Sequence, residues 1–271
     1  MDMLEIIEKR RSVRTFNGEQ IKEEDLKKIV EYANEVENPY GLSITWKVLD
    51  PNKYGLRSPV IVDAPCFIAG KIAKAPHAEE AFGYSFEKLL LFANSLGIGS
   101  VWIAGTLNRP AFEQAMELAQ GEAMPSVSPL GYEAKKMSFR ETMMRKAINA
   151  DSRMDFGELF FDESFDKPLS VEKAGDLARA LESVRLSPSA VNKQPWRAVL
   201  IKDKVAFYEK QSGGYVSNDG WDLQKVDVGI ALSHFAIAAK ALGKKVAFEI
   251  DEPKINTPRD VYYIATYKIE E

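Results

Sequence analysis

Hydrophobic residues recur at helical or alternating spacing along most of the chain. Residues 26–33 place apolar side chains at helical spacing behind an acidic first turn, and residues 44–49 alternate as a strand does. Residues 83–96 and 229–242 are apolar on nearly every side, which is typical of buried helices. Further helices are expected at 1–11, 110–118 and 137–147, and further strands at 64–70, 100–105 and 126–132.

The second part of the chain repeats the order of elements in the first. In both, a helix, a proline break and a strand precede a long apolar helix, and the breaks fall at Pro39 and Pro188. The two apolar helices align at Gly83 with Gly229, Ala93 with Ala239, and Leu96-Gly97 with Leu242-Gly243. Two unrelated stretches with Leu-Gly helix ends are the alternative, but the shared order favours an internal duplication with halves at 1–150 and 151–271.

Composition excludes several classes of protein. The 271 residues carry 36 Lys and Arg against 40 Asp and Glu, a net charge of −4, so no general attraction to nucleic acid or anionic membranes is expected. A single cysteine, Cys66, allows no internal disulfide, and we expect a cytoplasmic protein. No run of about 18 apolar residues is present, and no secretory leader is expected at the N-terminus.

Several common catalytic and cofactor motifs are also missing. Two histidines and one cysteine cannot form a zinc site of the usual kind, and no GxSxG nucleophile elbow occurs. The glycine patterns of Rossmann and P-loop phosphate sites are absent too. The chain therefore shows no catalytic triad and no resident metal site.

Two short segments could bind a ligand. The first, RRSVR, brings three guanidinium groups and a hydroxyl group together over residues 10–14, and guanidinium matches phosphate geometry. Its alternative interpretation is a solvated basic helix end, which the helix dipole also favours.

The second segment, SPSAVNKQPW, covers residues 187–196 and precedes an apolar strand. Its two prolines restrict the backbone, so that short hydroxyl and amide side chains are held in place. Such groups suit a ligand rich in edge donors and acceptors, such as a flavin ring. A polar helix-to-strand loop without a ligand is the alternative.

Taken together, RRSVR and SPSAVNKQPW resemble the FMN-dependent nitroreductase family, and the resemblance covers essentially the whole chain. Residues 227–243 look like that family's central helix, and residues 129–133 like the end of its C-terminal strand. The resemblance implies an α+β nitroreductase-like fold, with two quasi-equivalent halves of mainly antiparallel sheet flanked by helices. In the usual family member both motifs lie in one domain, and two subunits form each FMN site.

This chain divides the two motifs between its halves. The positions that match the polar segment in the first half are Pro39-Tyr40-Gly41-Leu42, and those that match the basic segment in the second half are Phe160-Phe161-Asp162-Glu163. Each half lacks what the other retains. We therefore expect a fused pseudo-dimer with one FMN between its halves, for which a monomer suffices, and a second site that binds nothing because its acidic residues would repel a phosphate.

The family's binding positions transfer to this sequence residue by residue. Near the FMN phosphate and the pyrimidine edge the resemblance places Arg10, Arg11, Ser12 and Arg14; against the ring it places Pro188, Ser189, Ala190, Asn192 and Gln194. Backbone groups of Ile103, Ala104 and Gly105 are expected near the flavin N5 side, and Lys135, Lys136 and Arg140 near the phosphate. For Lys135 and Lys136 a solvated surface pair is the alternative.

The resemblance also implies the activity. NAD(P)H would reduce FMN in a ping-pong cycle, and a small oxidising substrate such as a nitroaromatic or a quinone would then take the electrons; the chemistry occurs on the cofactor, so no catalytic side chain is expected. A flavin-binding module for sequestration or sensing, with little turnover, is the second hypothesis. A flavin-free structural relative is the third.

Overall fold

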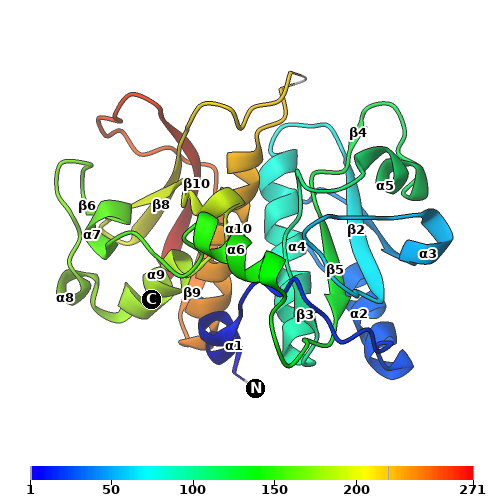
Figure 1. Ribbon diagram of the computed structural model, residues 1–271. Coiled ribbons are helices and arrows are strands. Elements are labelled where there is room, and N and C mark those ends of the chain that lie inside the picture. The colour runs from blue at the N-terminus through cyan, green and yellow to red at the C-terminus, as the bar shows by residue number, and fades with distance from the viewer. Residues whose placement is uncertain (1, 219, 271) are drawn as a thin grey trace. The chain divides into compact units, whose positions relative to one another are not determined.

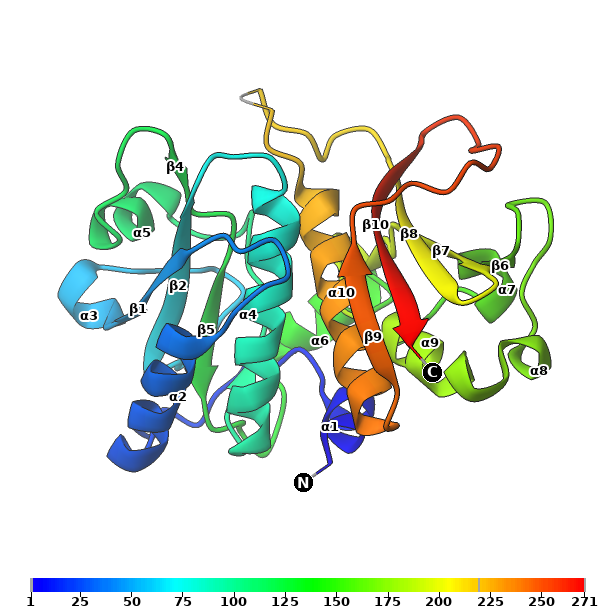
Figure 2. The same ribbon diagram turned by 180° about the vertical axis from the view of Figure 1, so that it is seen from behind.

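The computed structural model describes residues 2–218 and 220–270, which form two compact units. The first unit is Lys9–Asp151; the second comprises the segment before it, up to Glu8, and the chain from Ser152 onward. Figures 1 and 2 label their elements from opposite sides. Among the described residues, no helix has the length and apolar character needed to cross a membrane.

The first unit is an antiparallel sheet with helices packed on it. Its strands pair in the order β1-β2-β5-β3, and a short strand β4 pairs with β2. Helices α2 and α4 contact each other, and α4 also packs on β2 and β3. The elements are α2 (Glu23–Glu35), β1 (Ile44–Leu49), α3 (Pro51–Tyr54), β2 (Cys66–Ala73), α4 (Ala78–Ser95), β3 (Gly99–Ser100), α5 (Arg109–Ala115), β4 (Glu122–Ala123), β5 (Val127–Gly131) and α6 (Phe139–Ala147).

The second unit contains a five-stranded sheet in the order β6-β7-β8-β10-β9. Strand β6 runs parallel to β7, and the other pairs are antiparallel. Helix α10 packs on α9 and on β8. The elements are α1 (Met3–Lys9), whose last residue opens the first unit, α7 (Phe156–Leu159), β6 (Phe160–Asp162), α8 (Val171–Ala174), η1 (Gly175–Leu177), α9 (Ala178–Arg185), η2 (Ala190–Asn192), β7 (Trp196–Ile201), β8 (Lys204–Lys210), α10 (Leu223–Ala241), β9 (Lys245–Glu249) and β10 (Val261–Glu270).

The two sheets share one strand order. Apart from β6, the second sheet reads β7-β8-β10-β9, and each strand has the neighbours and the antiparallel direction of its counterpart in β1-β2-β5-β3. In each unit a helix (α2 or α9) precedes the first of these strands, and a long helix (α4 or α10) follows the second. The two units therefore share one arrangement of strands and helices, and the internal duplication stays a prediction.

The two long helices are buried along most of their length, as their apolar sequences predict. In α4 every residue from Glu80 to Glu87 is buried, and in α10 every residue from Val226 to Phe235 is buried. A helix buried at consecutive positions has no solvent-facing side, so its few polar residues must find partners inside the protein. Glu87 and His234 are examples: Glu87 accepts from the Trp102 indole at 2.7 Å, and the His234 ring lies 2.9 Å from the Ser183 carbonyl oxygen.

Some element boundaries differ from the predictions. The strand expected over 100–105 is wrong in extent, because β3 has only Gly99 and Ser100 and the chain then turns; Ile103 pairs with Val127 as an isolated bridge. Helix α1 ends at Lys9, before the arginines, and helix α6 begins at Phe139, where Ser138 Oγ accepts from the Glu141 amide. The arginine segment is therefore extended chain and not a helix end.

A close contact between β1 and β2 yields a stability prediction. Gly70 lies opposite Trp46, and a Cβ atom built on it would lie within 3 Å of the indole, which is itself packed against Phe82 and Phe86. We expect Gly70→Ala to lower the free energy of unfolding by about 1–3 kcal/mol. At Gly105 a Cβ atom would meet nothing within 4 Å, so Gly105→Ala should change it by less than about 0.5 kcal/mol. Chemical denaturation of both variants measures the difference, and equal stabilities would refute the packing argument.

Candidate functional site

The arginine segment of the first unit is an extended strand-like stretch fixed on two sides. The Val13 amide donates to the Ser100 carbonyl oxygen, and the Val62 amide donates to the Arg14 carbonyl oxygen, both at 2.9 Å. Alternate side chains of an extended segment share a face. Arg10 and Ser12 accordingly line one pocket together.

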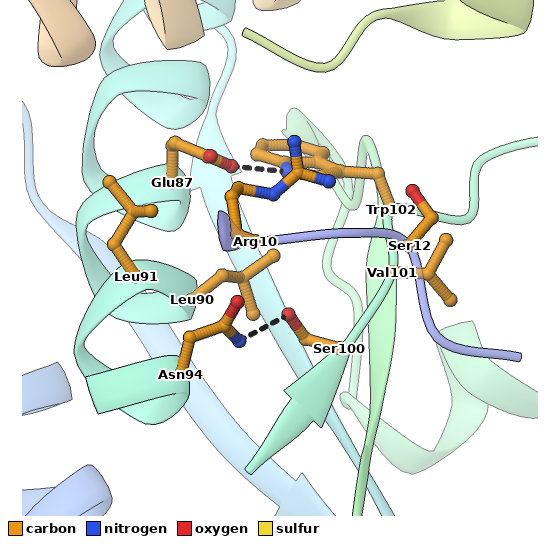
Figure 3. Close-up of a pocket in the computed structure, with 9 residues that line it drawn as sticks. All are labelled: Arg10, Ser12, Glu87, Leu90, Leu91, Asn94, Ser100, Val101 and Trp102. Carbon is orange, nitrogen blue, oxygen red and sulfur yellow. Dashed lines mark hydrogen bonds between the residues drawn. The ribbon is translucent and has the colours of Figure 1, made fainter. Parts of the chain in front are cut away.

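That pocket is lined by both polar and apolar side chains. Helix α4 contributes Glu87, Leu90, Leu91 and Asn94, and the end of β3 contributes Ser100, Val101 and Trp102. Figure 3 shows the Arg10 guanidinium beside the Glu87 carboxylate, which is bonded to the Trp102 indole, and Asn94 bonded to Ser100. Burial lowers the pKa of Arg10, the nearby Glu87 opposes this shift, and Arg145 adds to it by charge repulsion.

Arg14 is a buried cation with an unused donor. The residue is 7% exposed, and among the described residues its Nη1 atom has no hydrogen-bond partner. Burial lowers the pKa of Arg14, Glu141 opposes that shift, and Arg145 and Arg10 both reinforce it. Because arginine does not lose its proton in proteins, the structure contains a charge that an added anion would stabilise.

Arg145 is the third member of this group, and the sequence analysis did not select it. It lies on α6 four residues after the buried Glu141, so both side chains share a helix face. Its charge acts on both Arg10 and Arg14, and it also pairs with the exposed Asp151. The four-residue spacing from Glu141 could have indicated that Arg145 shares its helix face, but nothing in the sequence showed that Glu141 is buried. We call Arg10, Arg14 and Arg145 the basic cluster.

Arg11 has a different role from its neighbours. Its guanidinium forms ion pairs with Glu133 and, at 3.3 Å, with the buried Glu141. Two carboxylates therefore already neutralise it. Within the RRSVR segment, the charge left for a ligand belongs to Arg10 and Arg14.

The other candidates of the first unit lie at its surface or in its sheet. Lys135, Lys136 and Arg140 are exposed, and Arg140 donates to the Pro59 carbonyl oxygen at 3.3 Å. The Ile103 amide and carbonyl both pair with Val127, so they are used within the protein. The Ala104 carbonyl accepts from Arg109 at 2.7 Å, and Gly105 is exposed.

In the second unit, residues 187–195 form the polar loop between α9 and β7. Its amide side chains bind the protein itself: Gln194, 3% exposed, accepts from the Met154 amide at 3.0 Å, and Asn192 donates to the Ser152 carbonyl oxygen at 3.1 Å. Ser189 Oγ accepts from the Gln194 amide at 2.9 Å. These side chains shape the loop, whereas Val191 is 53% exposed and faces outward.

The backbone of the polar loop is strained. Val191, Asn192 and Gln194 have φ values of 44°, 59° and 51°, in the left-handed region that favours glycine. Each such residue costs on the order of 1–3 kcal/mol and persists only when its surroundings hold it. For the β-branched Val191 the conformation is a clear outlier.

Asp227 on α10 provides one of the bonds that hold this loop. Both of its carboxylate oxygens lie 3.1 Å from the Ala190 amide nitrogen, and the residue is 4% exposed. Burial raises the pKa of Asp227 well above its ordinary value; the Ala190 hydrogen bond opposes this shift, and the charges of Asp222 and Glu209 add to it. The sequence analysis did not single out Asp227.

At the positions of the second unit that align with the arginine segment, the polarity is reversed. Asp162 is buried at the end of β6 and is paired with Lys167. In the described part of the chain, no group of three or more His, Cys, Asp or Glu residues could hold a metal ion. The structure therefore contains one basic cluster and one polar loop, each within its own unit.

Comparison with known proteins identifies relatives over most of the chain. The model of a family described as "Putative TM nitroreductase" matches residues 2–239. A solved structure of a putative nitroreductase from Thermotoga maritima matches 99% of this chain and 93% of its own, with a TM-score of 0.65 at 19% identity. At that identity the likeness shows the fold.

Shorter solved structures match about half of the chain. A nitroreductase family protein from Clostridium difficile 630 covers 58% of this chain and 96% of its own, with 21% identity and a TM-score of 0.46. A nitroreductase with bound FMN from Bacteroides fragilis covers 51% and 92%, with 20% identity and a TM-score of 0.41. No curated protein matches this chain.

The buried Asp227 yields a pH prediction. A carboxyl group whose pKa is raised in the folded state binds its proton more tightly there, so its contribution to stability falls as the pH rises from about 4 toward the folded-state pKa. Asp227→Asn removes this dependence, and we expect it to gain stability relative to the parent protein as the pH rises, by at most about 1.4 kcal/mol per pH unit. Denaturation of both proteins from pH 4.5 to 8 tests this; a constant difference would contradict it.

Proposed function

Because the chain belongs to the family described as putative TM nitroreductase, we propose that it is an FMN-dependent oxidoreductase. Its electron donor is NAD(P)H, and its acceptor is a small oxidising compound such as a nitroaromatic or a quinone. The observation that carries this proposal is the buried Arg14 guanidinium, whose Nη1 has no partner among the described residues, within the basic cluster.

The basic cluster fits the phosphate of FMN. A phosphate at Arg14 would receive the unused Nη1 donor and would relieve the repulsion among Arg10, Arg14 and Arg145. Charge-assisted hydrogen bonds of this kind contribute about 1.5–3 kcal/mol each. Ser12, which lines the pocket with Arg10, adds a hydroxyl donor.

For the ring of FMN we propose a role of the polar loop that differs from the sequence-based expectation. Gln194 and Asn192 are bonded within the protein, so their amides support the loop. The groups that remain for a flat aromatic ring with a polar edge are the exposed Val191 side chain and the hydroxyl hydrogen of Ser189. We propose that the backbone shape of the loop forms the surface that contacts the flavin, and that its side-chain amides contribute by holding this shape.

Bound FMN would supply the redox chemistry, accepting a hydride and passing electrons on. The residues of this chain would bind and orient the cofactor and the substrate. Guanidinium groups in a partly buried site stabilise negative charge more strongly than they do in water. Cys66 takes no part as a nucleophile, because burial raises the pKa of its thiol to about 12.

We propose one FMN for each chain. Among the described residues the basic cluster and the polar loop each occur once. The positions that align with them hold Asp162, which pairs with Lys167, in one unit and Pro39–Leu42 in the other. A buried acid paired with a lysine offers no free positive charge to a phosphate. One chain therefore has the residues for one site, and we propose that a monomer suffices and acts in the cytoplasm.

A visible spectrum tests the proposal directly. Protein loaded with FMN and freed of excess should be yellow, with one flavin per chain, and NAD(P)H added without oxygen should bleach it. If the protein is yellow but does not bleach, the enzyme hypothesis fails and the hypothesis of a flavin-binding module with little turnover is favoured. Colourless protein that ignores added FMN would refute the proposal, and two flavins per chain would refute the single site.

The basic cluster predicts a ranking of two arginine variants. Arg14→Ala should weaken FMN binding at least tenfold, because it removes a charge-assisted contact worth roughly 1.5–3 kcal/mol. Arg11→Ala should have a smaller effect, since Glu133 and Glu141 already hold that guanidinium. Titrating apoprotein with FMN and following the quenching of flavin fluorescence measures both affinities. Equal affinities for Arg14→Ala and the parent would show that the cluster does not bind the phosphate.

A further inference from the structure

Most bonds of the polar loop connect it to itself or to nearby irregular chain. Within the loop, the Asn192 amide donates to the Ser189 carbonyl oxygen and the Lys193 amide to the Ala190 carbonyl oxygen, both at 3.1 Å. Gln194 and Asn192 bind residues 152–154. None of these bonds fixes the loop to a long buried helix.

The bond from the Ala190 amide to Asp227 does fix it. Asp227 lies in the second turn of α10, and its carboxylate meets the residue directly before the left-handed Val191 and Asn192. A strained backbone needs an anchor that does not itself move. A carboxylate on a helix buried over ten successive positions provides one.

Asp227 occupies an unfavourable place for a carboxyl group. It is buried and shares its surroundings with the carboxylates of Asp222 and Glu209 and the hydroxyl of Tyr215. A buried acid without a bound cation costs free energy that an apolar side chain of similar size would avoid. Its presence therefore needs a compensating interaction, and the Ala190 amide is the interaction that both of its oxygens make.

The other unit supplies an internal comparison. When Gly83 is aligned with Gly229, the position of Asp227 is held by Ala81, a fully buried alanine on α4. The segment that aligns with the polar loop, residues 39–42, has a positive φ only at Gly41, where it costs little. The unit without the acid is thus also without the strained loop.

We propose that Asp227 is a positioning residue that holds Val191 and Asn192 in the left-handed conformation, and with them the loop shape needed to receive the flavin ring. This positioning role rests on the proposed function, because the shape of the strained loop matters only if the loop binds the flavin. Asp227 acts through the Ala190 amide and touches neither cofactor nor substrate. Removing the anchor should let Val191 and Asn192 relax to ordinary backbone angles and lose the shape of the site.

Two measurements on the same variants test the proposal. Amide hydrogen exchange at Ala190 reports the anchor, and titration with FMN reports the site. Asp227→Ala should raise Ala190 exchange at least tenfold and weaken FMN binding about tenfold. Asp227→Asn keeps a carbonyl acceptor and should restore most of both. Asp222→Asn is the matched control. It removes a second buried carboxylate near Asp227, one that accepts a hydrogen bond from the Gln224 amide and not from Ala190. This variant should leave Ala190 exchange within threefold of the parent.

A double variant distinguishes a loop effect from general damage. Glycine adopts positive φ without strain, so a loop that carries Val191→Gly should depend less on the anchor. Because Val191→Gly also removes a side chain proposed to meet the ring, the single variant Val191→Gly is the reference, and adding Asp227→Ala to it should weaken FMN binding less than threefold. Exchange in β8 should stay at its parental rate in every variant, which shows that the sheet is intact. A further tenfold loss of FMN affinity in the double variant relative to Val191→Gly, or faster exchange throughout the second unit, would overturn the positioning role.

The outcomes also separate this inference from the proposed function. If the parent protein binds no FMN, the proposed function fails and the positioning role falls with it, whatever the exchange data show about the anchor. If the parent binds FMN but Asp227→Ala binds it equally well, the proposed function stands and the positioning role is overturned. Unchanged Ala190 exchange in Asp227→Ala would overturn the role on its own.

Discussion

The ligand-binding potential of the first unit depends on one buried charge, that of Arg14, whose Nη1 has no hydrogen-bond partner among the described residues. Arg14 is almost fully enclosed, and Glu141, the acid that acts most strongly on it, is bonded to Arg11. Had Glu141 paired with Arg14, the unit would contain an ordinary buried ion pair. Because arginine keeps its proton at any physiological pH, the unmet need for an anion is permanent. The environment, and not the number of arginines, distinguishes this segment from a solvated basic patch.

The two units show how much chemistry can change on one arrangement of strands. Their sheets have the same order, which apolar residues on buried strands and helices can specify without any particular polar residue. At aligned positions the units differ in the groups that matter for a ligand: Ala81 aligns with Asp227, and Asp162 lies where the other unit is basic. Site chemistry can therefore diverge while the fold persists.

Periodicity predicted the long helices and the paired strands because burial imposes that periodicity on the sequence. Strand ends were less predictable: β3 stops at Ser100 because its pairing with β5 stops there, which the apolar run over 100–105 does not reveal. Basic residues posed a similar difficulty. The chain from Lys135 to Lys146 offers several cations, and only the three-dimensional position of α6 selects Arg145 over the exposed Arg140. Likewise, Arg11 differs from Arg14 because it pairs with Glu133 and Glu141, which lie more than 100 residues away in the chain.

The polar loop shows that side chains which a motif assigns to a ligand can also hold their own loop together. Amides and hydroxyls on a proline-bounded loop suggested groups aimed at a ligand, yet Asn192 and Gln194 satisfy backbone groups of residues 152 and 154. Buried polar atoms must be bonded, and a loop with three left-handed residues needs such bonds more than most. In this loop the polar side chains maintain a backbone shape, and that shape is what a ligand would meet. The shape of the loop should therefore change more when a substitution keeps an amide side chain but alters the preferred backbone angles than when an exposed polar group is removed.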